Sequence, residues 1–436
     1  MLIQAFKEKV KKRKLRIGVA GLGYVGLPLA VAFAKAGFHV TGIDVDRGKV
    51  ERLNAGDSYI LDVPSEEVRA LVSRRRLHAV HEHKVIAGLD VIVICVPTPL
   101  SKKGKPDISF VLKATAEIAR HLKKGQLVVL ESTSYPGTTE DMMLPLLEKK
   151  SGLKVEKDFF LAFSPERVDP GNKNFDTVSI PKVVGGVGRF STEAAKEVYG
   201  SIIRETVPVS SAKTAEMVKL LENTFRSVNI ALINEIALLS HRFGIDIWEV
   251  IQAAKTKPFG FMPFYPGPGI GGHCLPIDPV YLSWKSREHG FVARMIELAS
   301  EINESMPEKV VERLIDLLNT RKVALKGAPV LVLGVAYKRD VDDARESPAL
   351  DVIDELRRRG ADVSYADPFV PAIDLNGVRL RSKKLTRELV ARQRAAVVLT
   401  DHSAFDYAML VKSSKLVFDT RNVLRKYEKN PNVFFL

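Results

Sequence analysis

The clearest pattern of hydrophobic and polar positions begins at Leu15, where the chain reads LRIGVAGLGYVGLPLAVAFAKAGFHVTGIDVD. An apolar run of strand length is followed by a glycine-rich turn and by an alanine-rich stretch with helical spacing. Gly37 ends the predicted helix, and a second apolar strand ends at Asp44. This order predicts a βαβ unit, in which a crossover helix joins two parallel strands.

Further strands are predicted at 91–96, 127–130 and 159–163, where short apolar runs are bounded by proline, glycine or charged residues. Near-continuous apolar runs of this length are typical of strands that are buried on both faces of a sheet. We therefore expect a parallel sheet whose strands are connected by helices.

The pattern changes after about residue 205. Residues 214–243 contain no proline or glycine and are largely apolar, which predicts one long helix that Gly244 ends. A second helix is predicted at 246–254. Residues 257–279 are too rich in proline and glycine for a helix or strand, and a long irregular loop inside a compact domain is usually functional.

The βαβ pattern returns after Val323, without the phosphate-binding glycines of the first unit. Apolar strands are predicted within 328–338, 361–368, 395–402 and 415–422. One helix is predicted at 349–359. The chain is therefore expected to have an α/β fold, in which two Rossmann-like doubly wound domains are joined by a central helical domain. The expected boundaries are 1–205, 206–320 and 321–436.

Length and composition agree with several folded domains. The chain has 436 residues, of which 46% are hydrophobic and 27% charged, which excludes a disordered or collagen-like chain. Two cysteines cannot form a disulfide framework or a multi-thiolate zinc site, so we expect a cytoplasmic protein without a metal site. No apolar run approaches the ~18 residues of a membrane span, and the basic start lacks the apolar stretch of a targeting peptide.

The formal net charge is +14, with 66 Lys and Arg against 52 Asp and Glu. Six of these net charges lie in residues 7–16, where seven basic side chains are offset by Glu8. Such a tract could contact nucleic acid or anionic lipid. Because chain termini are usually poorly ordered, we expect instead a solvated, frayed leader to the first strand, with no nucleic-acid or membrane partner.

Gly21, Gly23 and Gly26 form a GxGxxG pattern between the first strand and the first helix. The first glycine permits a tight turn, the second lets a pyrophosphate approach the backbone, and the third lets helix and strand pack closely. Asp44 ends the next strand, where a carboxylate accepts hydrogen bonds from ribose hydroxyls and repels a 2′-phosphate. The pattern predicts NAD rather than NADP as the cofactor, the alternative being a glycine turn without a ligand.

The two cysteines lie in different surroundings. Cys95 lies in the apolar run VIVICV and is interpreted as a structural residue with a raised pKa. Cys274 lies in a glycine-rich loop beside His273, with Asp278 four residues later, which suits an activated nucleophile as well as a structural loop cysteine. No second ligand stands near His273 at a metal-like spacing, so this histidine is interpreted as a positioning residue.

Lys219, Asn223 and Arg226 are spaced i, i+4 and i+7 on the long predicted helix and so share one face. A cation beside an amide on a largely apolar helix could form a wall that stabilises an oxyanion. The alternative is a solvated edge of a buried helix.

Several motifs together resemble the UDP-sugar 6-dehydrogenases of the UDP-glucose/GDP-mannose dehydrogenase family. They are GLGYVG with Asp44, EST from Glu131, SPERVDPG from Ser164, VKLLEN with Lys219 and Asn223, PGPGIGGHCLPID around Cys274, and YKRDVDDARESPA from Tyr337. The resemblance covers essentially the whole chain. It implies two Rossmann-like domains flanking a helical dimerisation domain, hence a homodimer, and oxidation of C6 of a UDP-hexose from alcohol to carboxylate with two NAD⁺.

The resemblance also implies roles for single residues. The cysteine matching Cys274 adds to the C6 aldehyde, and a second oxidation turns the thiohemiacetal into a thioester that water hydrolyses. Lys219 matches a lysine that stabilises the C6 oxyanions, Asn223 an assisting asparagine, and Asp278 an aspartate that handles protons or the hydrolytic water. The implied catalytic residues are Cys274, Lys219, Asn223, Asp278, Thr133 and Glu166, the last pair matching positions around that water.

The implied binding residues form two sets. For the cofactor they are Gly21, Gly23, Tyr24, Val25, Gly26, Asp44, Arg47, Thr98, Thr133 and Arg345. For the substrate they are Glu166, Arg167, Val168, Lys219, Asn223, Arg226, Tyr265, Gly271, Tyr337, Lys338 and Arg421.

Departures from the family pattern bear on the sugar. Members acting on UDP-glucose usually carry a lysine where this chain has Ile277, and a PEFL run where this chain has Arg167-Val168-Asp169-Pro170 after Glu166. The run GGHC and the sequence 257–269 resemble members acting on UDP-N-acetylhexosamines, and most of all on UDP-N-acetylglucosamine. Without that lysine, Asp278 is expected to lack its usual neighbouring charge.

The alternatives are a UDP-N-acetylmannosamine or UDP-glucose 6-dehydrogenase, a two-electron hydroxyacid dehydrogenase, and a non-catalytic nucleotide- or nucleic-acid-binding protein. A hydroxyacid dehydrogenase would need neither Cys274 nor a second sheet domain. Nucleic-acid binding is motivated by the charge alone, because the sequence has no recognition-helix, aromatic-platform or repeat signature.

Overall fold

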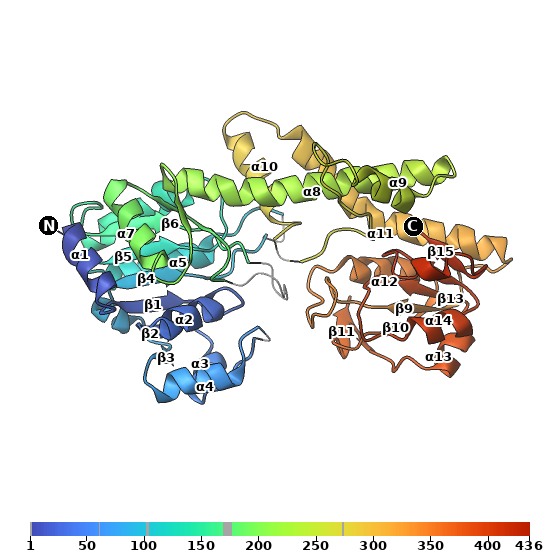
Figure 1. Cartoon of the computed structure of the whole chain (residues 1–436), viewed down its shortest axis with the longest axis horizontal. Coiled ribbons are helices and arrows are strands. Elements are labelled where there is room, and N and C mark those ends of the chain that lie inside the picture. Colours follow the sequence, from blue (N-terminus) through green and yellow to red (C-terminus); the bar gives the residue numbers. More distant parts are fainter. Residues whose placement is uncertain (1, 61, 102–103, 169–176, 273) are drawn as a thin grey trace. The chain divides into compact units, whose positions relative to one another are not determined.

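The structure is a computed structural model that describes residues 2–60, 62–101, 104–168, 177–272 and 274–436. It confirms the predicted α/β class with parallel sheets (Figure 1). The chain separates into two compact units, Met1–Glu222 with Val280–Phe291, and Asn223–Pro279 with Val292–Leu436. The division into three domains at 205 and 320 stays a prediction.

The first unit is built on an eight-stranded sheet with the order β3-β2-β1-β4-β5-β6-β7-β8. Its strands are β1 (Arg16–Ala20), β2 (His39–Ile43), β3 (Leu77–Val80), β4 (Val91–Ile94), β5 (Leu127–Leu130), β6 (Phe160–Phe163), β7 (Lys182–Gly186) and β8 (Thr206–Pro208). Its helices are α1 (Leu2–Lys11), α2 (Gly26–Lys35), α3 (Arg47–Asn54), α4 (Ser65–Ser73), η1 (His83–Gly88), α5 (Ser109–His121), η2 (Thr138–Met143), α6 (Leu144–Ser151) and α7 (Arg189–Tyr199).

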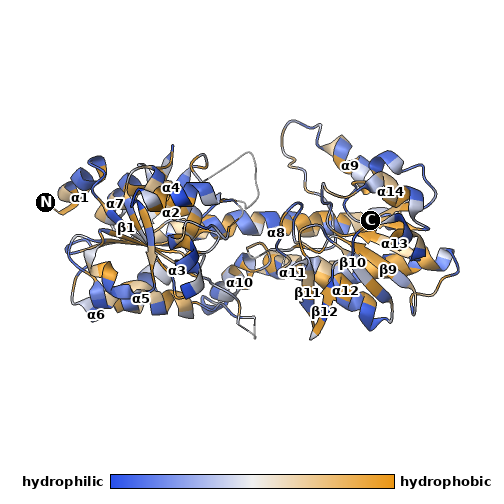
Figure 2. Ribbon diagram, turned by 90° about the horizontal axis from the view of Figure 1, so that it is seen from below, coloured by the Kyte–Doolittle hydropathy of each residue, from blue (hydrophilic) through white to orange (hydrophobic). Residues whose placement is uncertain are grey.

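The predicted βαβ unit is present as β1, α2 and β2, and β1 pairs with β2 and β4 in parallel. Helices α1, α2, α4 and α7 cover one face of this sheet, and α5 and α6 cover the other (Figure 2). The predicted strands lie in the parallel part of this sheet, whereas β7, which was not predicted, runs antiparallel to β6. Strand β8 pairs with β7 in parallel, so these two strands at one side of the sheet run opposite to the others, as is common in large mixed sheets.

The N-terminal tract is a helix and not the frayed leader expected from the sequence. In α1, Ile3, Phe6 and Val10 are at most 8% exposed, and their spacing of three and four residues places them on one helical face. The ring of Phe6 meets that of Phe160 on β6 edge-on, with 5.7 Å between the centroids. The expectation was wrong because it followed the general behaviour of chain termini, whereas here an apolar stripe packs the helix onto the sheet.

Much of the basic charge of this tract is also paired. Lys7 Nζ lies 3.0 Å from a carboxylate oxygen of Glu193 on α7, and Lys9 Nζ lies 2.8 Å from Asp90 Oδ1. These exposed pairs contribute little stability, but they reduce the part of the charge excess that a polyanion could use.

The second unit contains a five-stranded parallel sheet with the order β10-β9-β13-β14-β15 and a hairpin of β11 and β12. The strands are β9 (Pro329–Leu333), β10 (Asp362–Ala366), β11 (Ala372–Leu375), β12 (Val378–Arg381), β13 (Ala395–Val398), β14 (Val417–Asp419) and β15 (Val433–Phe435). Its helices are α9 (Ile247–Ala254), α11 (Arg294–Thr320), α12 (Pro348–Arg358), α13 (Arg387–Arg392), α14 (Tyr407–Ser413) and η3 (Arg425–Tyr427).

Side chains of β9 alternate between two cores, as a strand with helices on both faces requires. Val330 and Val332 pack with residues of α11 and α12, whereas Leu331 and Leu333 pack with residues of α13 and α14. The hydropathy colouring shows apolar residues along the strands of this sheet (Figure 2).

Two helices, α8 (Ala212–Arg242) and α10 (Asp278–Glu288), have residues in both units. The predicted long helix is confirmed as α8, and Gly244, with φ +69°, follows its end. Helix α11 was not predicted, and Pro307 inside it is ordinarily a sign of a helix boundary. Among the described residues, no helix is long and apolar enough to cross a membrane.

Candidate functional site

The glycine turn after β1 has the geometry that a bound dinucleotide needs. Gly21 has φ +94°, and a Cβ there would lie 2.4 Å from the carbonyl oxygen of Cys95. A Cβ on Gly26 would lie 1.8 Å from the carbonyl oxygen of Gly21, so only glycine lets α2 begin this close to β1. Around a Cβ on Gly23, apart from its chain neighbours, no described heavy atom lies within 4 Å, which leaves the backbone open to a pyrophosphate.

Asp44 follows β2 and is 8% exposed. Its Oδ2 accepts a hydrogen bond from Leu22 N at 2.8 Å, and its Oδ1 accepts one from Asp46 N at 2.9 Å. Each oxygen keeps a lone pair for a ribose hydroxyl. The open backbone at Gly23 and this carboxylate fit a dinucleotide, with the pyrophosphate at the start of α2 and the adenosine ribose at Asp44.

Three further residues predicted to bind the cofactor lie near this turn in the sequence. Tyr24 is 45% exposed, Val25 directly precedes α2, and Arg47 is the first residue of α3. Their contact with the cofactor stays a prediction.

The remaining predicted cofactor residues are more dispersed. The carbonyl oxygen of Thr98 accepts a hydrogen bond from Tyr281 Oη at 2.8 Å, and Thr133 lies three residues after β5. Arg345 belongs to the second unit, where its guanidinium forms a bidentate pair with Asp343 at 2.9 and 2.7 Å.

Cys95 lies directly after β4 and beneath the glycine turn, where its Cβ is 3.2 Å from the position of a Cβ on Gly26. Burial raises the pKa of its thiol well above the ordinary value, and the Glu131 carboxylate raises it further. A thiol that stays protonated packs as a small hydrophobic group. This is the environment expected of a structural cysteine.

A buried lysine joins two carboxylates on the sheet of the first unit. Lys182 begins β7, and its side chain is 4% exposed. Its Nζ lies 2.9 Å from Glu166 Oε2 and 3.3 Å from Glu131 Oε1. Burial would lower the pKa of Lys182, but the two carboxylates raise it above its ordinary value, so the ammonium is retained.

Glu166, one of the predicted catalytic residues, is held ionised by this lysine. Burial alone would raise the pKa of its carboxyl, but the Lys182 ammonium outweighs burial, and the pKa lies below its ordinary value. The N–H groups of Arg167 and Val168 donate to Glu166 Oε1 at 2.9 and 2.7 Å. The Lys219 ammonium lowers the pKa of Glu166 further, which relates two predicted catalytic residues electrostatically.

Glu131 has the opposite character within the same cluster. Burial raises the pKa of its carboxyl despite Lys182. Tyr199 Oη donates to Glu131 Oε1 at 2.5 Å, and Glu131 Oε2 has no hydrogen-bond partner among the described residues. Sequence reasoning did not single out Lys182 or Tyr199, although a lysine opening the apolar run KVVGG was a signal for Lys182.

Arg167 connects the segment after β6 to α8. Its guanidinium forms a bidentate pair with Glu222 at 2.6 and 3.3 Å, and its Nη1 donates to the carbonyl oxygen of Pro181 at 2.7 Å. Lys219, one turn earlier on α8, is 8% exposed. Because Glu222 already compensates the charge of Arg167, any anion at Arg167 must compete with that pair.

In the second unit, hydrogen bonds join three of the predicted catalytic residues. Asn223 Nδ2 donates to Asp278 Oδ2 at 2.5 Å, and Asp278 N donates to the carbonyl oxygen of Cys274 at 2.8 Å. Asn223 and Asp278 are 6% and 3% exposed, whereas Cys274 is exposed. Asp278 was expected in the loop but begins α10.

The glycines between 267 and 272 pack against the C-terminal sheet. A Cβ on Gly267 would lie 2.8 Å from Arg421 Nη1, and one on Gly271 would lie 2.9 Å from Tyr337 Cβ. Gly272, with φ +90°, lies against the ring of Tyr337. The predicted substrate residues Gly271, Tyr337 and Arg421 therefore lie in one region of this unit.

Two buried asparagines, which sequence reasoning did not identify, tie this loop to the long helices. Gly267 N donates to Asn234 Oδ1 at 3.0 Å, and Asn234 Nδ2 donates to Asn303 Oδ1 at 3.0 Å. Asn303 Nδ2 donates to the carbonyl oxygen of Ser227 at 3.1 Å. This chain of hydrogen-bonded amides between α8, α11 and the loop holds the middle of the loop at Gly267.

Some of the other predicted substrate residues are more exposed to solvent. Arg226 on α8 is exposed, and the ring of Tyr265 stacks on Trp248 with centroids 5.9 Å apart. Lys338 lies in the turn that follows β9. His273 and the Asp169-Pro170 pair lie outside the described residues.

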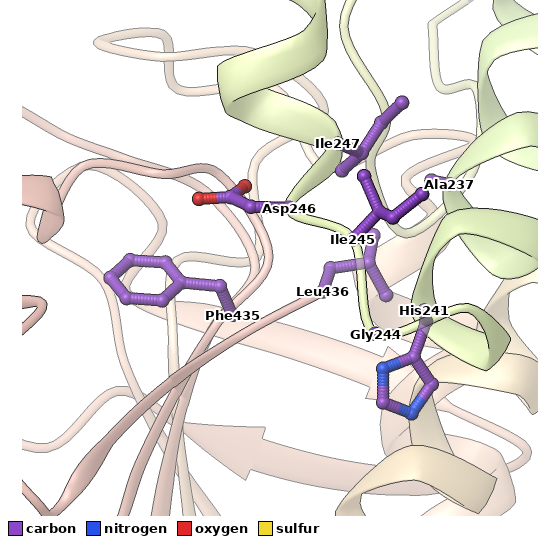
Figure 3. A pocket seen from close by; sticks show the side chains of 8 residues that line it. All are labelled: Ala237, His241, Gly244, Ile245, Asp246, Ile247, Phe435 and Leu436. Atoms are coloured by element: carbon purple, nitrogen blue, oxygen red, sulfur yellow. The ribbon is translucent and has the colours of Figure 1, made fainter.

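A cavity of about 260 Å³ lies in the second unit, at the end of α8 and beside the last two residues (Figure 3). None of the residues predicted for the site is among those that line it, which are Ala237, His241, Gly244, Ile245, Asp246, Ile247, Phe435 and Leu436. The cavity therefore gives no support to the predicted catalytic residues.

The sequence matches three domain models of one family. Residues 15–203 match the NAD binding domain of the UDP-glucose/GDP-mannose dehydrogenase family, residues 213–305 its central domain, and residues 331–426 its UDP binding domain. Together the matches cover most of the chain.

Individual proteins support the same relation. The chain is 37% identical to a UDP-N-acetyl-D-mannosamine dehydrogenase of Pyrococcus horikoshii, over 97% of this chain and 98% of the relative. It is 39% identical to a UDP-N-acetyl-D-glucosamine 6-dehydrogenase of Pseudomonas aeruginosa, over 83% of this chain and 85% of the relative. A solved structure of a UDP-D-ManNAc dehydrogenase from Pyrococcus horikoshii superposes with a TM-score of 0.88 at 36% identity, covering 97% of this chain and 98% of that one.

The glycine turn predicts different results for two matched substitutions. In Gly23→Ala the new methyl group meets no described atom, so we expect an unchanged thermal unfolding midpoint and about tenfold or greater loss of NADH affinity, because the methyl occupies the space of the pyrophosphate. In Gly26→Ala the methyl meets the carbonyl oxygen of Gly21, so the unfolding midpoint should fall. Calorimetric titration and thermal unfolding measure both. Unchanged NADH affinity in a folded Gly23→Ala variant would contradict this placement of the dinucleotide.

Proposed function

This chain belongs to the UDP-glucose/GDP-mannose dehydrogenase family, and from that premise we propose that it oxidises C6 of UDP-N-acetylglucosamine to UDP-N-acetylglucosaminuronate. Membership makes it an NAD-dependent oxidoreductase that acts on a UDP-sugar. A two-electron hydroxyacid dehydrogenase and a non-catalytic binding protein are therefore set aside.

The exposed thiol of Cys274, beside two buried polar residues, is the observation that carries the proposed four-electron reaction. The carbonyl oxygen of Cys274 accepts the hydrogen bond of Asp278 N, so the thiol lies on the turn that leads into α10. An exposed cysteine is accessible to an electrophile, as a nucleophile must be. Cys95 lacks these properties, since burial keeps its thiol protonated.

In the proposed reaction Cys274 retains the aldehyde between two oxidations. NAD supplies the hydride acceptor in each oxidation. The Cys274 thiolate adds to the C6 aldehyde and forms a thiohemiacetal; removal of its hydride leaves a thioester, and water then releases the carboxylate and the free thiol. Lys219 donates to the C6 oxygen and stabilises its negative charge in both additions.

Two carboxylates serve the proton transfers of this proposal. Asp278 is assigned proton transfer near Cys274, and two hydrogen bonds support this: its Oδ2 accepts from Asn223, and its N–H donates to the carbonyl oxygen of Cys274. Glu166 is the second, and Lys182 keeps it ionised and able to accept a proton from the hydrolytic water. Lys182 is thus assigned the role of a positioning residue.

The N-acetylated substrate rests on residues around the loop and on named relatives. Ile277 replaces the lysine that UDP-glucose-specific members usually carry, and relatives from two genera at 39% and 38% identity are named UDP-N-acetyl-D-glucosamine 6-dehydrogenases. The manno epimer is the second candidate, because the relative that matches over 97% of the chain is named a UDP-N-acetyl-D-mannosamine dehydrogenase.

A homodimer through α8 is the second part of the proposal. Five large apolar side chains on this helix are 41–60% exposed, namely Met217, Leu221, Phe225, Leu232 and Leu239. At 100° per residue they fall within a stripe about 80° wide. An apolar stripe of this kind on a helix marks a surface for another protein surface, here a second copy.

A panel of UDP-sugars tests the substrate. Purified protein with NAD⁺ should oxidise UDP-N-acetylglucosamine faster than UDP-N-acetylmannosamine and UDP-glucose, and should form two NADH per sugar because oxidation proceeds to the carboxylate. Absorbance at the NADH band and mass spectrometry of the product provide the measurement. Faster turnover of the manno epimer would transfer the assignment to it, and one NADH per sugar would exclude the four-electron reaction.

The two cysteines provide a matched pair for the mechanism. Cys274→Ser should lose the second oxidation, because a serine hydroxyl is a weaker nucleophile that does not form the thioester, and turnover should fall by about 10³-fold or more. Cys95→Ser should retain turnover within about threefold, since that thiol only packs. Steady-state NADH formation measures both. Equal behaviour of the two variants would disprove the assignment of Cys274.

The α8 stripe predicts the oligomeric state. Wild-type protein should elute with twice the chain mass in size exclusion with light scattering, and Leu232→Lys should move it toward the monomer because a charge replaces an apolar contact. Val378→Lys, at an exposed apolar residue of the β11/β12 hairpin, is the control and should remain dimeric. A monomeric wild-type protein, or a Leu232→Lys variant that remains dimeric, would count against this interface.

A further inference from the structure

The turn after β9 in the second unit corresponds in position to the glycine turn after β1. Residues 334–340, which we name the β9 turn, contain Tyr337 and Lys338. Gly334 has φ +80°, and a Cβ there would lie 2.4 Å from the carbonyl oxygen of Thr400. The carboxyl ends of the parallel strands β9, β10 and β13 lie at one sheet edge, so the turns that follow them meet there.

Asp367, directly after β10, holds the beginning of the β9 turn. Its Oδ2 accepts hydrogen bonds from Val335 N at 2.7 Å and Ala336 N at 3.2 Å. Its Oδ1 accepts from Phe369 N at 2.8 Å and Val370 N at 2.9 Å. Burial would raise the pKa of this carboxyl, but its hydrogen bonds outweigh burial, and the pKa lies below its ordinary value.

His402, beyond β13, holds the end of the same turn and is fully buried. Its Nδ1 accepts a hydrogen bond from Asp340 N at 2.9 Å, so the ring proton lies on Nε2, which is 3.0 Å from Asp367 Oδ2. The imidazole is enclosed by the rings of Phe369 and Phe405, with centroids 5.0 and 5.6 Å away.

The β9 turn has an uncommon backbone conformation where His402 holds it. Asp340 has φ +57°, in the left-handed region, which aspartate tolerates better than most residues other than glycine. Ser403 N donates to Asp340 Oδ1 at 2.8 Å, and Thr400 Oγ1 donates to the carbonyl oxygen of Ala336 at 2.6 Å. Hydrogen bonds at both ends therefore impose one conformation on the residues between them.

We propose that His402 and Asp367 are positioning residues for the nucleotide, which hold the β9 turn so that Lys338 can bind the UDP part of the substrate. The inference rests on the proposed role of Lys338 in substrate binding. Neither residue of the pair is assigned contact with the substrate, since both are enclosed by backbone N–H groups and aromatic rings. The pair acts through the backbone, and its loss should weaken UDP binding while NAD binding stays the same.

Titration of the full-length protein with UDP alone tests this inference, because UDP is common to every candidate substrate. His402→Phe keeps the ring packing and removes both hydrogen bonds, so UDP affinity should fall about tenfold to hundredfold, with NADH affinity changed less than about twofold. His402→Asn places an amide oxygen near the position of Nδ1 and should recover part of the affinity. If His402→Phe does not fold, the UDP affinity of His402→Asn is compared with that of the wild type instead.

A double-mutant cycle separates positioning from simple stability. If His402 acts through Lys338, His402→Phe should cost little further UDP affinity in a Lys338→Met background. Leu410→Ala, in the core of the same sheet, is the control: it should lower the unfolding midpoint with UDP affinity unchanged.

Two outcomes would overturn the inference: a folded His402→Phe variant with wild-type UDP affinity, and additive losses in the cycle. Wild-type protein that binds UDP but does not oxidise UDP-N-acetylglucosamine would overturn only the proposed function. Wild-type protein that does not bind UDP would overturn both.

Discussion

In both sheet units a carboxylate at the end of one strand holds the backbone turn that follows the neighbouring parallel strand. Asp44 accepts from Leu22 N after β1, and Asp367 accepts from Val335 N after β9, at 2.8 and 2.7 Å. These turns carry the groups assigned to the cofactor in the first unit and to the nucleotide in the second, so each predicted binding region depends on its own carboxylate. The bonds are charge-assisted and buried, which makes them strong and specific.

The two carboxylates differ in their remaining capacity to accept hydrogen bonds. Asp44 accepts two backbone bonds and keeps lone pairs for ribose hydroxyls, whereas the oxygens of Asp367 accept from four backbone N–H groups and from His402. The related position in the second sheet therefore cannot bind a ribose through its carboxylate. This explains in physical terms how one βαβ pattern can appear twice with a dinucleotide assigned only to the first.

Sequence reasoning reached the parts of this structure that depend on local periodicity and fixed spacing. The βαβ unit, the long helix α8 and the glycine turn with Asp44 follow from patterns within about 30 residues. It did not predict helix α1, whose three buried apolar residues lie among charged residues in the sequence. It also did not predict the antiparallel strand β7. It did not find Lys182 or His402, because their importance arises from partners 16 to 62 residues away that only the fold brings together.

Buried charge is concentrated where the proposed chemistry needs it. Lys182 lies between two carboxylates, yet only Glu166 has a pKa below its ordinary value, since Glu131 is more deeply desolvated and keeps an oxygen without a hydrogen-bond partner among the described residues. A single ammonium does not fully compensate two buried carboxyls, and the pKa values of the two are shifted in opposite directions. The Lys182 ammonium thus keeps Glu166, the carboxylate to which proton acceptance is assigned in the proposal, ionised, and Glu131 is the second partner of that ammonium. That division of roles is a reason for retaining a costly buried lysine in an otherwise apolar sheet.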